Sequence, residues 1–407
     1  MVVDVRTISA AELHPWSVAV RRGFLNPAEM DDSDLRRPFM PLERTWGAFD
    51  DTKIVATLRS FPVELTLPGG GQVPAAAVTQ VTTTATHRRQ GLANRLVMAD
   101  LVACREREEP LSILIAAEWP IYGRWGYGPA TESQAFAVDT RRARVSGVAS
   151  ATPELVDRAE FRRAAAKLYD EIRLDQAGEI SRSDWFWDLD LGILQLPTKP
   201  EVPAAFHLLT RNADGGVTGA MRYRVETSWE GMLPAATVTV DSLFSSDVDA
   251  YLAQWHYLFA LDLVTQVQIG DRAVDELIPL LLDDPRRARA EKRHDFLWCR
   301  VLDVPAVLSA RRFRVEGSVV LGITDPQGLV AGSYELTGGP DGAACSPSTR
   351  SAEITMPVST LGAILLGGYA LRRFERAGWA HEDRTGALTT ADAMFSTSAA
   401  PWCNTWF

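Results

Sequence analysis

The stretch VTTTATHRRQGLANRL, residues 81–96, decides the fold of the first part of the chain. A run of β-branched residues leads into a basic turn, and apolar residues then recur at helical spacing, which predicts a strand, a turn and a helix. Backbone N–H groups at a helix start have no partner within the helix and lie at the positive end of its dipole. Gly91 lets a ligand approach the backbone, and Arg88 and Arg89 can add charged hydrogen bonds. The stretch therefore predicts an anion site suited to a pyrophosphate.

The turn by itself leaves a purely structural role open, because similar turns occur in ordinary strand–turn–helix units. Two other phosphate-binding patterns are absent from the sequence. It contains no G-x-x-x-x-G-K-[ST], and no G-x-G-x-x-G follows a strand with an acidic residue behind it. These absences disfavour a nucleoside triphosphatase and a dinucleotide-dependent dehydrogenase.

A second segment follows one helix later. LSILIAA, residues 111–117, is a continuous apolar run between Pro110 and Pro120, which predicts a buried parallel strand. Directly after it comes EWPIYGRWGYGPAT, residues 118–131. The order of turn, helix, buried strand and glycine-rich segment is more specific than any of them alone.

Residues 81–96 resemble motif A of the GNAT superfamily of acetyltransferases. IYGRWGYGPAT at 121–131 is similar to the IYGRFGYGPAT of one branch, the enhanced intracellular survival (Eis) family of aminoglycoside and lysine acetyltransferases, and THRRQGL at 86–92 fits the same branch. The resemblance implies that the backbone of Val81 and Thr83 binds the pantetheine arm and thioester of acetyl-CoA. It also implies a pyrophosphate site formed by Arg88, Arg89, Gly91, Leu92 and Ala93.

The resemblance further implies two groups that transfer protons. In the superfamily, the short helix after the buried strand carries a tyrosine that faces the thioester. We expect Tyr127 to be this general acid and Tyr122 to be a core aromatic. A phenol stays protonated at neutral pH, so it can give a proton to a thiolate. The family's chains end in Phe, whose terminal carboxylate acts as the base, and this chain ends in Phe407.

The acceptor pocket is expected on resemblance alone. Trp16 and Phe24 lie where the family places aromatic pocket residues, and Trp406 replaces an acidic residue next to the terminal Phe. Asn26 likewise stands where a relative carries an acid. The family's pocket is wide and accepts several amine positions on aminoglycosides or lysine side chains, and its members assemble as hexamers.

Composition limits the class of protein. The chain has 407 residues, of which 46% are hydrophobic, so two or three domains are expected. A net charge of −10 disfavours nucleic-acid binding and suits a cationic amine. Four scattered cysteines and the absence of a visible signal peptide or long apolar run favour a cytoplasmic protein without a membrane span. No metal-binding motif is present, so no metal is expected.

The fold class predicted is α/β (α+β), with three domains. Residues 1–148 form the acetyltransferase domain, 149–290 a degenerate acetyltransferase-like domain, and 291–407 a sterol-carrier-like domain that delivers the C-terminal carboxylate. In the first domain we expect helices at 8–25, 88–107 and 120–125 and strands at 55–61, 63–67, 73–83 and 111–117. The second is expected to hold helices at 154–173 and 247–262 and strands at 205–210, 218–225, 236–242 and 264–269. The third is expected to hold strands at 316–323, 329–336 and 352–356 and a helix at 358–366.

Two alternative functions remain open from the sequence. The chain could be a non-catalytic scaffold that binds acetyl-CoA or lipid, or a GNAT enzyme restricted to protein lysine or to the amine of a small metabolite. The terminal Phe407 and the tyrosine motif count against the first.

Overall fold

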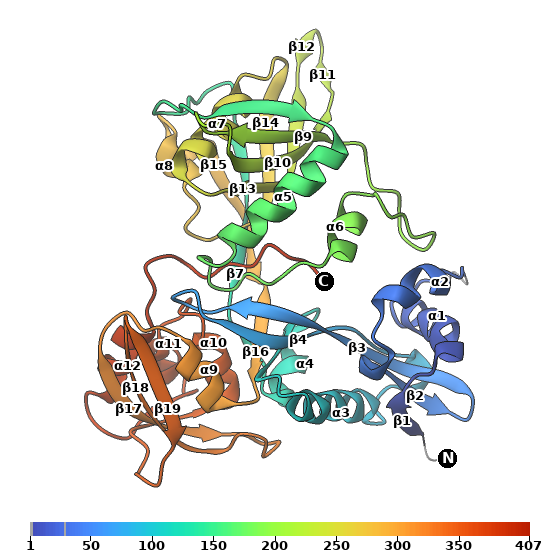
Figure 1. Cartoon of the computed structure of the whole chain (residues 1–407), viewed down its shortest axis with the longest axis vertical. Coiled ribbons are helices and arrows are strands. Elements are labelled where there is room, and N and C mark those ends of the chain that lie inside the picture. The colour runs from blue at the N-terminus through green and yellow to red at the C-terminus, as the bar shows by residue number, and fades with distance from the viewer. Residues whose placement is uncertain (1–2, 28–29) are drawn as a thin grey trace.

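The computed structural model describes residues 3–27 and 30–407 and contains three α/β parts (Figure 1). The first is a seven-stranded sheet with strand order β1-β2-β3-β4-β5-β16-β6. The strands are β1 (Asp4–Thr7), β2 (Thr45–Asp50), β3 (Lys53–Thr66), β4 (Gln72–Thr83), β5 (Leu111–Ile115), β16 (Leu297–Val301) and β6 (Gly128–Pro129). Helix α3 (Leu92–Glu106) covers one face and α1 (Leu13–Gly23) the other, while α2 (Ser33–Arg36) and α4 (Trp119–Tyr122) are single turns.

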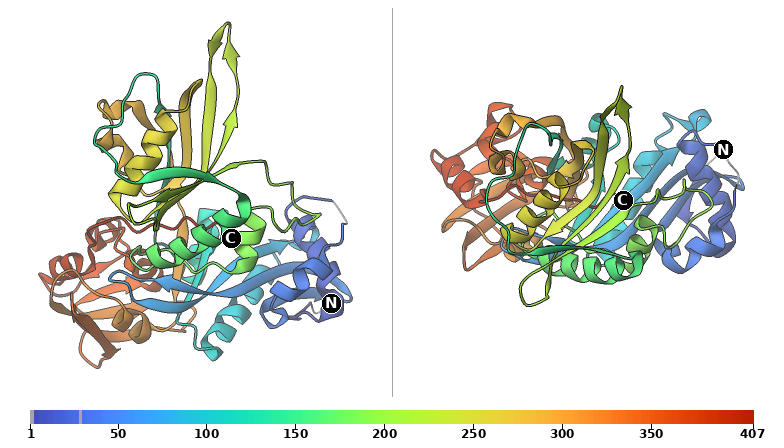
Figure 2. Two further views of the ribbon diagram at one scale, coloured as in Figure 1. Left: turned by 45° about the horizontal axis from the view of Figure 1, so that its top comes forward. Right: turned by 90° about the horizontal axis from the view of Figure 1, so that it is seen from above.

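The second part has its own seven-stranded sheet, in the order β15-β7-β14-β13-β10-β9-β8. Its strands are β15 (Ala288–Asp295), β7 (Glu132–Asp139), β14 (Val264–Arg272), β13 (Ala236–Ser245), β10 (Val217–Glu226), β9 (Phe206–Arg211) and β8 (Thr152–Val156). Its helices are α5 (Arg158–Ile172), α6 (Asp184–Asp190), α7 (Val248–Phe259) and α8 (Ile278–Leu281). The hairpin of β11 (Trp229–Glu230) and β12 (Leu233–Pro234) projects from this part (Figure 2).

The third part is a five-stranded sheet, ordered β19-β18-β17-β20-β21, with four helices. The strands are β17 (Gly317–Thr324), β18 (Gly332–Gly339), β19 (Gly342–Pro347), β20 (Ile354–Pro357) and β21 (His381–Glu382). The helices are α9 (Val304–Ala310), α10 (Val358–Ile364), α11 (Leu371–Arg376) and α12 (Ala387–Phe395). Short 3-10 helices elsewhere lie at Ala10–Glu12, Arg37–Phe39, Leu42–Arg44, Ala85–His87, Gly123–Trp125 and Pro285–Arg287. Within residues 3–27 and 30–407, no helix is long and apolar enough to cross a membrane.

The first two sheets exchange strands. The chain leaves the first sheet after β6 and enters the second as β7, and it returns from β15 to β16. Thr131 holds this crossing, because its side chain accepts a hydrogen bond from the N–H of Leu297 at 3.0 Å. The sheets therefore do not follow the domain limits expected at 148 and 290: residues 132–139 belong to the second sheet and 297–301 to the first.

The third part is tied to the first by a buried ion pair. Arg300 on β16 donates to Asp325 at 2.7 Å, and neither side chain is exposed to solvent. One contiguous hydrophobic core also runs from β3, β4 and β16 into the helices of the third part. The C-terminal segment that follows α12 crosses this junction and ends between the first two sheets, next to α6 (Figure 1 and Figure 2).

Two expected elements differ from the structure. β3 is one continuous strand rather than two, because Pro62 pairs with Ala76 of β4 while β2 has already ended opposite Arg59. A proline is tolerated there since it lacks only the N–H that would have served that unpaired edge. The helix expected from 154 begins at Arg158, and residues 152–156 form β8.

Candidate active site

The turn before α3 is an open anion site. Gly91 precedes the helix in the left-handed conformation (φ 75°), and no side chain caps the first turn. Arg89 is also left-handed (φ 63°), and both Arg88 and Arg89 are exposed. Helices α5 and α7, by contrast, are capped by Asp157 and Asp247. The uncapped N–H groups and the two arginines together favour a multiply charged anion here.

The rest of the turn fits this use. Leu92 is buried and anchors the helix start in the core, while Ala93 is half-buried and small. No ion pair or side-chain hydrogen bond involves Arg88 or Arg89 among residues 3–27 and 30–407. Both guanidinium groups are therefore available to a ligand.

Three hydrogen bonds hold the turn in place. The N–H of Thr84 donates to the carbonyl of Val55 at 2.8 Å, and the His87 ring lies 3.2 Å from the Asp50 carboxylate. On the other side, the indole N–H of Trp125 donates to Asn94 in the first turn of α3 at 2.8 Å. The turn is thus fixed to β2, β3 and the segment after α4 before any ligand binds.

Strands β4 and β5 separate next to this turn. Their parallel pairing runs from Ala75 opposite Leu111 to Val78 opposite Leu114, and β4 continues five residues further. Gln80 adopts φ 57°, and the register with β3 shifts at this point, which is a bulge in β4. Beyond the bulge, Val81 and Thr83 lie on the strand edge that β5 no longer covers. Such an edge offers free backbone groups to an extended ligand.

The bulge is buttressed from the other face of the sheet. The Thr57 hydroxyl lies 2.7 Å from that of Thr82 and donates to the carbonyl of Gln80 at 2.9 Å. A Cβ added to Gly23, the last residue of α1, would lie 2.3 Å from the side chain of Thr82. Only glycine fits there, so the end of α1 and the loop after it are held against the separated end of β4.

Tyr127, the expected general acid, is buried in the core of the first part. It follows α4 and the 3-10 helix, is 1% exposed, and its hydroxyl lies 2.7 Å from that of Ser112 on β5. Burial raises the pKa of this phenol well above its usual value. The tyrosine on the short helix is Tyr122, the last residue of α4. Tyr127 itself lies two residues after the 3-10 helix, beside the Tyr122 ring.

Tyr122 lies beside Tyr127 but nearer to solvent. Its ring is 9% exposed and packs edge-on against Trp125 and Tyr127, with centroids 5.8 and 6.2 Å apart. Burial, and then the charge of Glu118, raises the pKa of the Tyr122 phenol. The hydroxyl therefore stays protonated through the neutral and mildly alkaline range.

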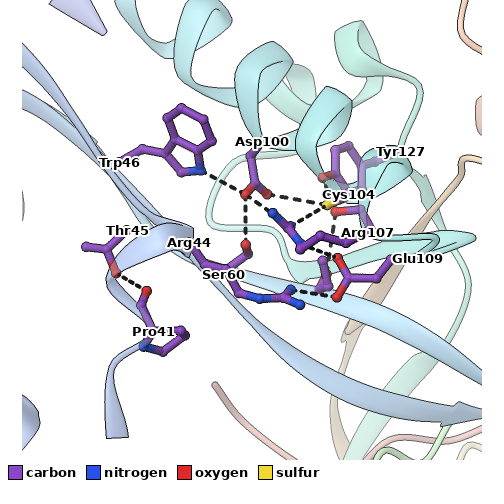
Figure 3. A network of polar contacts seen from close by, with 12 residues as sticks. Pro41, Arg44, Thr45, Trp46, Ser60, Asp100, Cys104, Arg107, Glu109 and Tyr127 are labelled. Carbon is purple, nitrogen blue, oxygen red and sulfur yellow. Dashed lines mark hydrogen bonds and ion pairs between the residues drawn. The ribbon is translucent and has the colours of Figure 1, made fainter. Parts of the chain in front are cut away.

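A polar network lies between α3 and the first sheet and holds the helix in place (Figure 3). The buried Asp100 carboxylate of α3 accepts hydrogen bonds from Ser60 at 2.8 Å and from the Trp46 indole at 3.0 Å. Burial raises the pKa of Asp100, against the effect of these two donors. The network fixes α3 to β2 and β3, and we interpret it as structural.

The C-terminal segment is held by the second part. Arg182 donates to the Thr405 hydroxyl at 2.8 Å and to the carbonyl of Asn404 at 3.1 Å, and its guanidinium lies 4.0 Å from the centre of the Tyr169 ring. The buried Glu179 accepts from the N–H of Asn404 at 3.2 Å and from the Tyr169 hydroxyl at 2.8 Å. No motif indicates this anchor, because Glu179 and Arg182 are single charges between α5 and α6.

The last two residues lie apart from one another. The Phe407 ring packs edge-on against Phe61 of β3, with centroids 5.7 Å apart. Trp406 is 62% exposed, and its ring contacts Phe296 at 5.4 Å. The structure thus brings Phe407 to the face of β3 opposite α3, and leaves Trp406 at the surface.

The residues expected in the acceptor pocket differ in their exposure to solvent. Phe24, directly after α1, is 59% exposed and close to Asn26, so both can contribute to an acceptor site. Trp16 is 1% exposed and donates its indole N–H to the carbonyl of Trp46 at 2.8 Å. The expectation for Trp16 was wrong, because the residue faces the core between α1 and the sheet.

A cavity with three tryptophans in its wall lies elsewhere. It has a volume of about 490 Å³ and separates α4 and β6 from the third part, with Trp119, Trp298 and Trp379 in its wall. Arg88, Gly91 and Phe407 do not line it. The candidate donor site is instead an open surface formed by the turn before α3 and the free edge of β4.

Comparisons with known proteins agree with this arrangement. Family models of the GNAT acetyltransferase domain match residues 4–130 and 178–301, and a model of the sterol carrier protein domain matches 304–404. An uncharacterized N-acetyltransferase of Streptomyces avermitilis is 41% identical, over 98% of both chains. The N-acetyltransferase Eis of Mycobacterium bovis is 30% identical, over 86% of this chain and 85% of that protein.

Solved structures give the same result. The crystal structure of Eis1 from Mycobacterium abscessus superimposes with a TM-score of 0.87 at 30% identity, covering 99% of this chain and 100% of that one. Two GNAT domains followed by a sterol-carrier-like domain are therefore shared over the full length. The chain belongs to the Eis family of GNAT N-acetyltransferases.

Proposed function

We propose that this N-acetyltransferase transfers an acetyl group from acetyl-CoA directly to an amine at the separated end of β4. Two observations support the proposal. The uncapped basic turn of α3 follows the free edge of β4, and the Phe407 ring packs on Phe61, which pairs with Ala77 of β4 just before β4 and β5 separate. GNAT acetyltransferases use acetyl-CoA, and the residues here fit it. Arg88, Arg89 and the backbone of 91–93 would hold its pyrophosphate, and the edge at Val81 and Thr83 its extended arm.

When bound, acetyl-CoA supplies an acyl group activated as a thioester. The backbone N–H groups beyond the bulge are suited to stabilise negative charge on an acyl oxygen. Holding both reactants on one rigid sheet edge contributes much of the rate, because it removes their relative freedom of motion.

Two side groups move protons in this proposal. The Phe407 carboxylate takes a proton from the acceptor ammonium, directly or through water, since an α-carboxyl is ionised at neutral pH. Tyr122 gives a proton to the departing thiolate, because it lies on the helix next to the donor site and its pKa is raised. Tyr127, the residue first expected in this role, instead holds Ser112 and the core of β5.

The acceptor is an amine, and the resemblance suggests the amines of aminoglycosides or of lysine-type substrates. A screen of aminoglycosides, polyamines, free lysine and lysine peptides, with thiol release from acetyl-CoA and product mass as readouts, tests this. Acetylation of at least one small amine supports the proposal. Acetyl-CoA binding without any transfer would favour the non-catalytic scaffold, and transfer to protein lysine alone would favour the restricted enzyme.

Assembly and location are proposed from the resemblance only. A hexamer predicts a mass six times that of the 44.7 kDa chain by light scattering. A cytoplasmic enzyme predicts recovery in the soluble fraction of its native host.

A further inference from the structure

An unpaired cation lies beside the proposed acceptor site. Arg59 stands on β3 opposite Thr79 of β4, just before the bulge at Gln80. Its neighbours Leu58 and Ser60 face α3, where Leu58 is in the core and Ser60 binds Asp100. Side chains alternate along a strand, so Arg59 projects from the opposite face, the one that carries Phe61 and Phe407.

Arg59 has no anionic partner within the described part of the chain. The residue is half-buried, its Nε atom is buried without a hydrogen-bond acceptor, and its guanidinium lies 5.3 Å from the centre of the Phe61 ring. Buried arginines elsewhere in the chain bind oxygen atoms: Arg300 binds Asp325, and Arg311 binds the carbonyl of Leu365. A buried N–H without an acceptor is costly, so the Arg59 guanidinium is a group that an anionic ligand can stabilise.

The neighbouring charges do not neutralise it. Burial, and then the charge of Arg36, lowers the pKa of Arg59 to about 10, so the group is still protonated at pH 7. The nearby Asp32 carboxylate already accepts from Arg36 at 2.7 Å and from Thr198. Lys199 is also close enough for Arg36 to lower its pKa. The cluster of Arg36, Arg59 and Lys199 with Asp32 therefore keeps a net positive charge.

The Phe61 ring contacts both Arg59 and Phe407, whose carboxylate is the proposed base. Phe61 contacts Arg59 through its face and Phe407 through an edge-on packing, so the two groups flank one aromatic side chain. The adjacent position carries the neutral Trp406 rather than an acid. An acceptor whose amine reaches the Phe407 carboxylate would thus meet a guanidinium one side chain away.

We infer that Arg59 binds a carboxylate on the acceptor, so that the acceptors are amines that also carry an anionic group, such as lysine-type amino acids, rather than polycationic aminoglycosides. The inference rests on the proposed function, since it concerns the same site. The guanidinium would donate two charged hydrogen bonds to the carboxylate of the acceptor, and the ammonium would face the terminal carboxylate. A polycation would place extra positive charge against the cluster of Arg36, Arg59 and Lys199.

The test compares amines that differ only in the carboxylate. Steady-state thiol release from acetyl-CoA is measured with lysine against cadaverine, ornithine against putrescine, and kanamycin. The proteins are wild type, Arg59→Gln, Arg59→Lys, and Arg105→Gln as a matched control on the exposed, opposite face. The wild type should prefer the carboxylate-bearing member of each pair by about 10- to 100-fold in kcat/KM. Arg59→Gln should abolish that preference, Arg59→Lys should keep part of it, and Arg105→Gln should keep all of it.

Thermal melting supplies a readout independent of turnover. Because Arg59 is unpaired, Arg59→Gln should melt no lower than wild type, and lysine should raise the wild-type melting temperature more than cadaverine does. Preference for the decarboxylated amines or kanamycin, or an unchanged preference in Arg59→Gln, overturns the inference and leaves the acetyltransferase proposal standing. Failure to bind acetyl-CoA, or to acetylate any amine, overturns both.

Discussion

Tyr122→Phe should lower kcat and leave stability unchanged, whereas Tyr127→Phe should lower stability and leave kcat nearly unchanged. Tyr122→Phe removes the proposed proton donor but no hydrogen bond that supports the fold. A positioned general acid contributes about 10²- to 10⁴-fold, so kcat should fall at least about 100-fold while the melting temperature stays within about 1 °C. Both variants keep the aromatic ring, so the packing against Trp125 is preserved.

Tyr127→Phe loses a buried hydrogen bond instead. The bond to Ser112 is 2.7 Å long, and the Ser112 hydroxyl would retain only a weak contact, 3.5 Å, with the carbonyl of Ala76. A buried hydrogen bond contributes about 0.5–1.5 kcal/mol net, and leaving Ser112 under-satisfied adds to the loss. Stability in urea should therefore fall by about 1–2 kcal/mol, with turnover within about threefold of wild type.

The assay is kcat at saturating acetyl-CoA and amine, combined with urea unfolding of the same preparations. The raised pKa of Tyr122 adds a condition: the phenol stays protonated above its usual range, so kcat should show no alkaline loss below about pH 10. Loss of turnover in Tyr127→Phe with retention in Tyr122→Phe would refute this reasoning and restore Tyr127 as the donor.

Three further variants test other parts of the account. Arg88→Ala should raise KM for acetyl-CoA about tenfold with less effect on the amine, because it removes a phosphate contact; equal effects on both constants would contradict the anion site. Arg182→Met should lower kcat about 10- to 100-fold at unchanged acetyl-CoA affinity, because it releases Thr405 and the end of the chain; steady-state kinetics with full turnover would show that the anchor is dispensable. Arg300→Met should cost about 3–5 kcal/mol of stability in urea, since it leaves Asp325 buried and unpaired; an unchanged midpoint would show that water reaches the pair.

Local signals in the sequence were sufficient to predict the turn and the strands of the proposed donor site. The uncapped basic turn and the buried strand after α3 were expected where the structure has them, although α3 begins at Leu92 rather than at 88 because Gly91 is left-handed. The tandem acetyltransferase-like architecture and the sterol-carrier-like part were also confirmed. These features depend on residues close together in the chain, for which periodicity and turn chemistry are informative.

Non-local features were not predictable in the same way. The apolar residues 297–301 would form a buried strand in any sheet, and nothing local specifies that they pair between β5 and β6. The orientation of Trp16 depends on which face of α1 meets the sheet, and the pocket assignment failed for that reason. The start of α5 is an exception, because Asp157 followed by Glu160 is a readable capping pattern that the helical periodicity obscured.

The acceptor side depends on contacts between distant segments. Arg182 meets Thr405 across 223 residues of sequence, and Arg59 is unusual only because its Nε atom is buried without an acceptor in the fold. Neither property can be read from the neighbouring residues. The sequence could therefore predict the turn of the proposed donor site, but not the charge of the side chains beside the proposed acceptor site.

The most direct test of the central claim concerns the terminal carboxylate of Phe407. Amidation of the C-terminus removes the charge and keeps the ring against Phe61. The measurement is kcat of the amidated chain, with KM for acetyl-CoA measured in the same experiment. If the carboxylate is the base, kcat should fall at least about 100-fold while KM for acetyl-CoA stays within about twofold. Full turnover in the amidated chain would show that the C-terminal segment only packs, and would contradict the account.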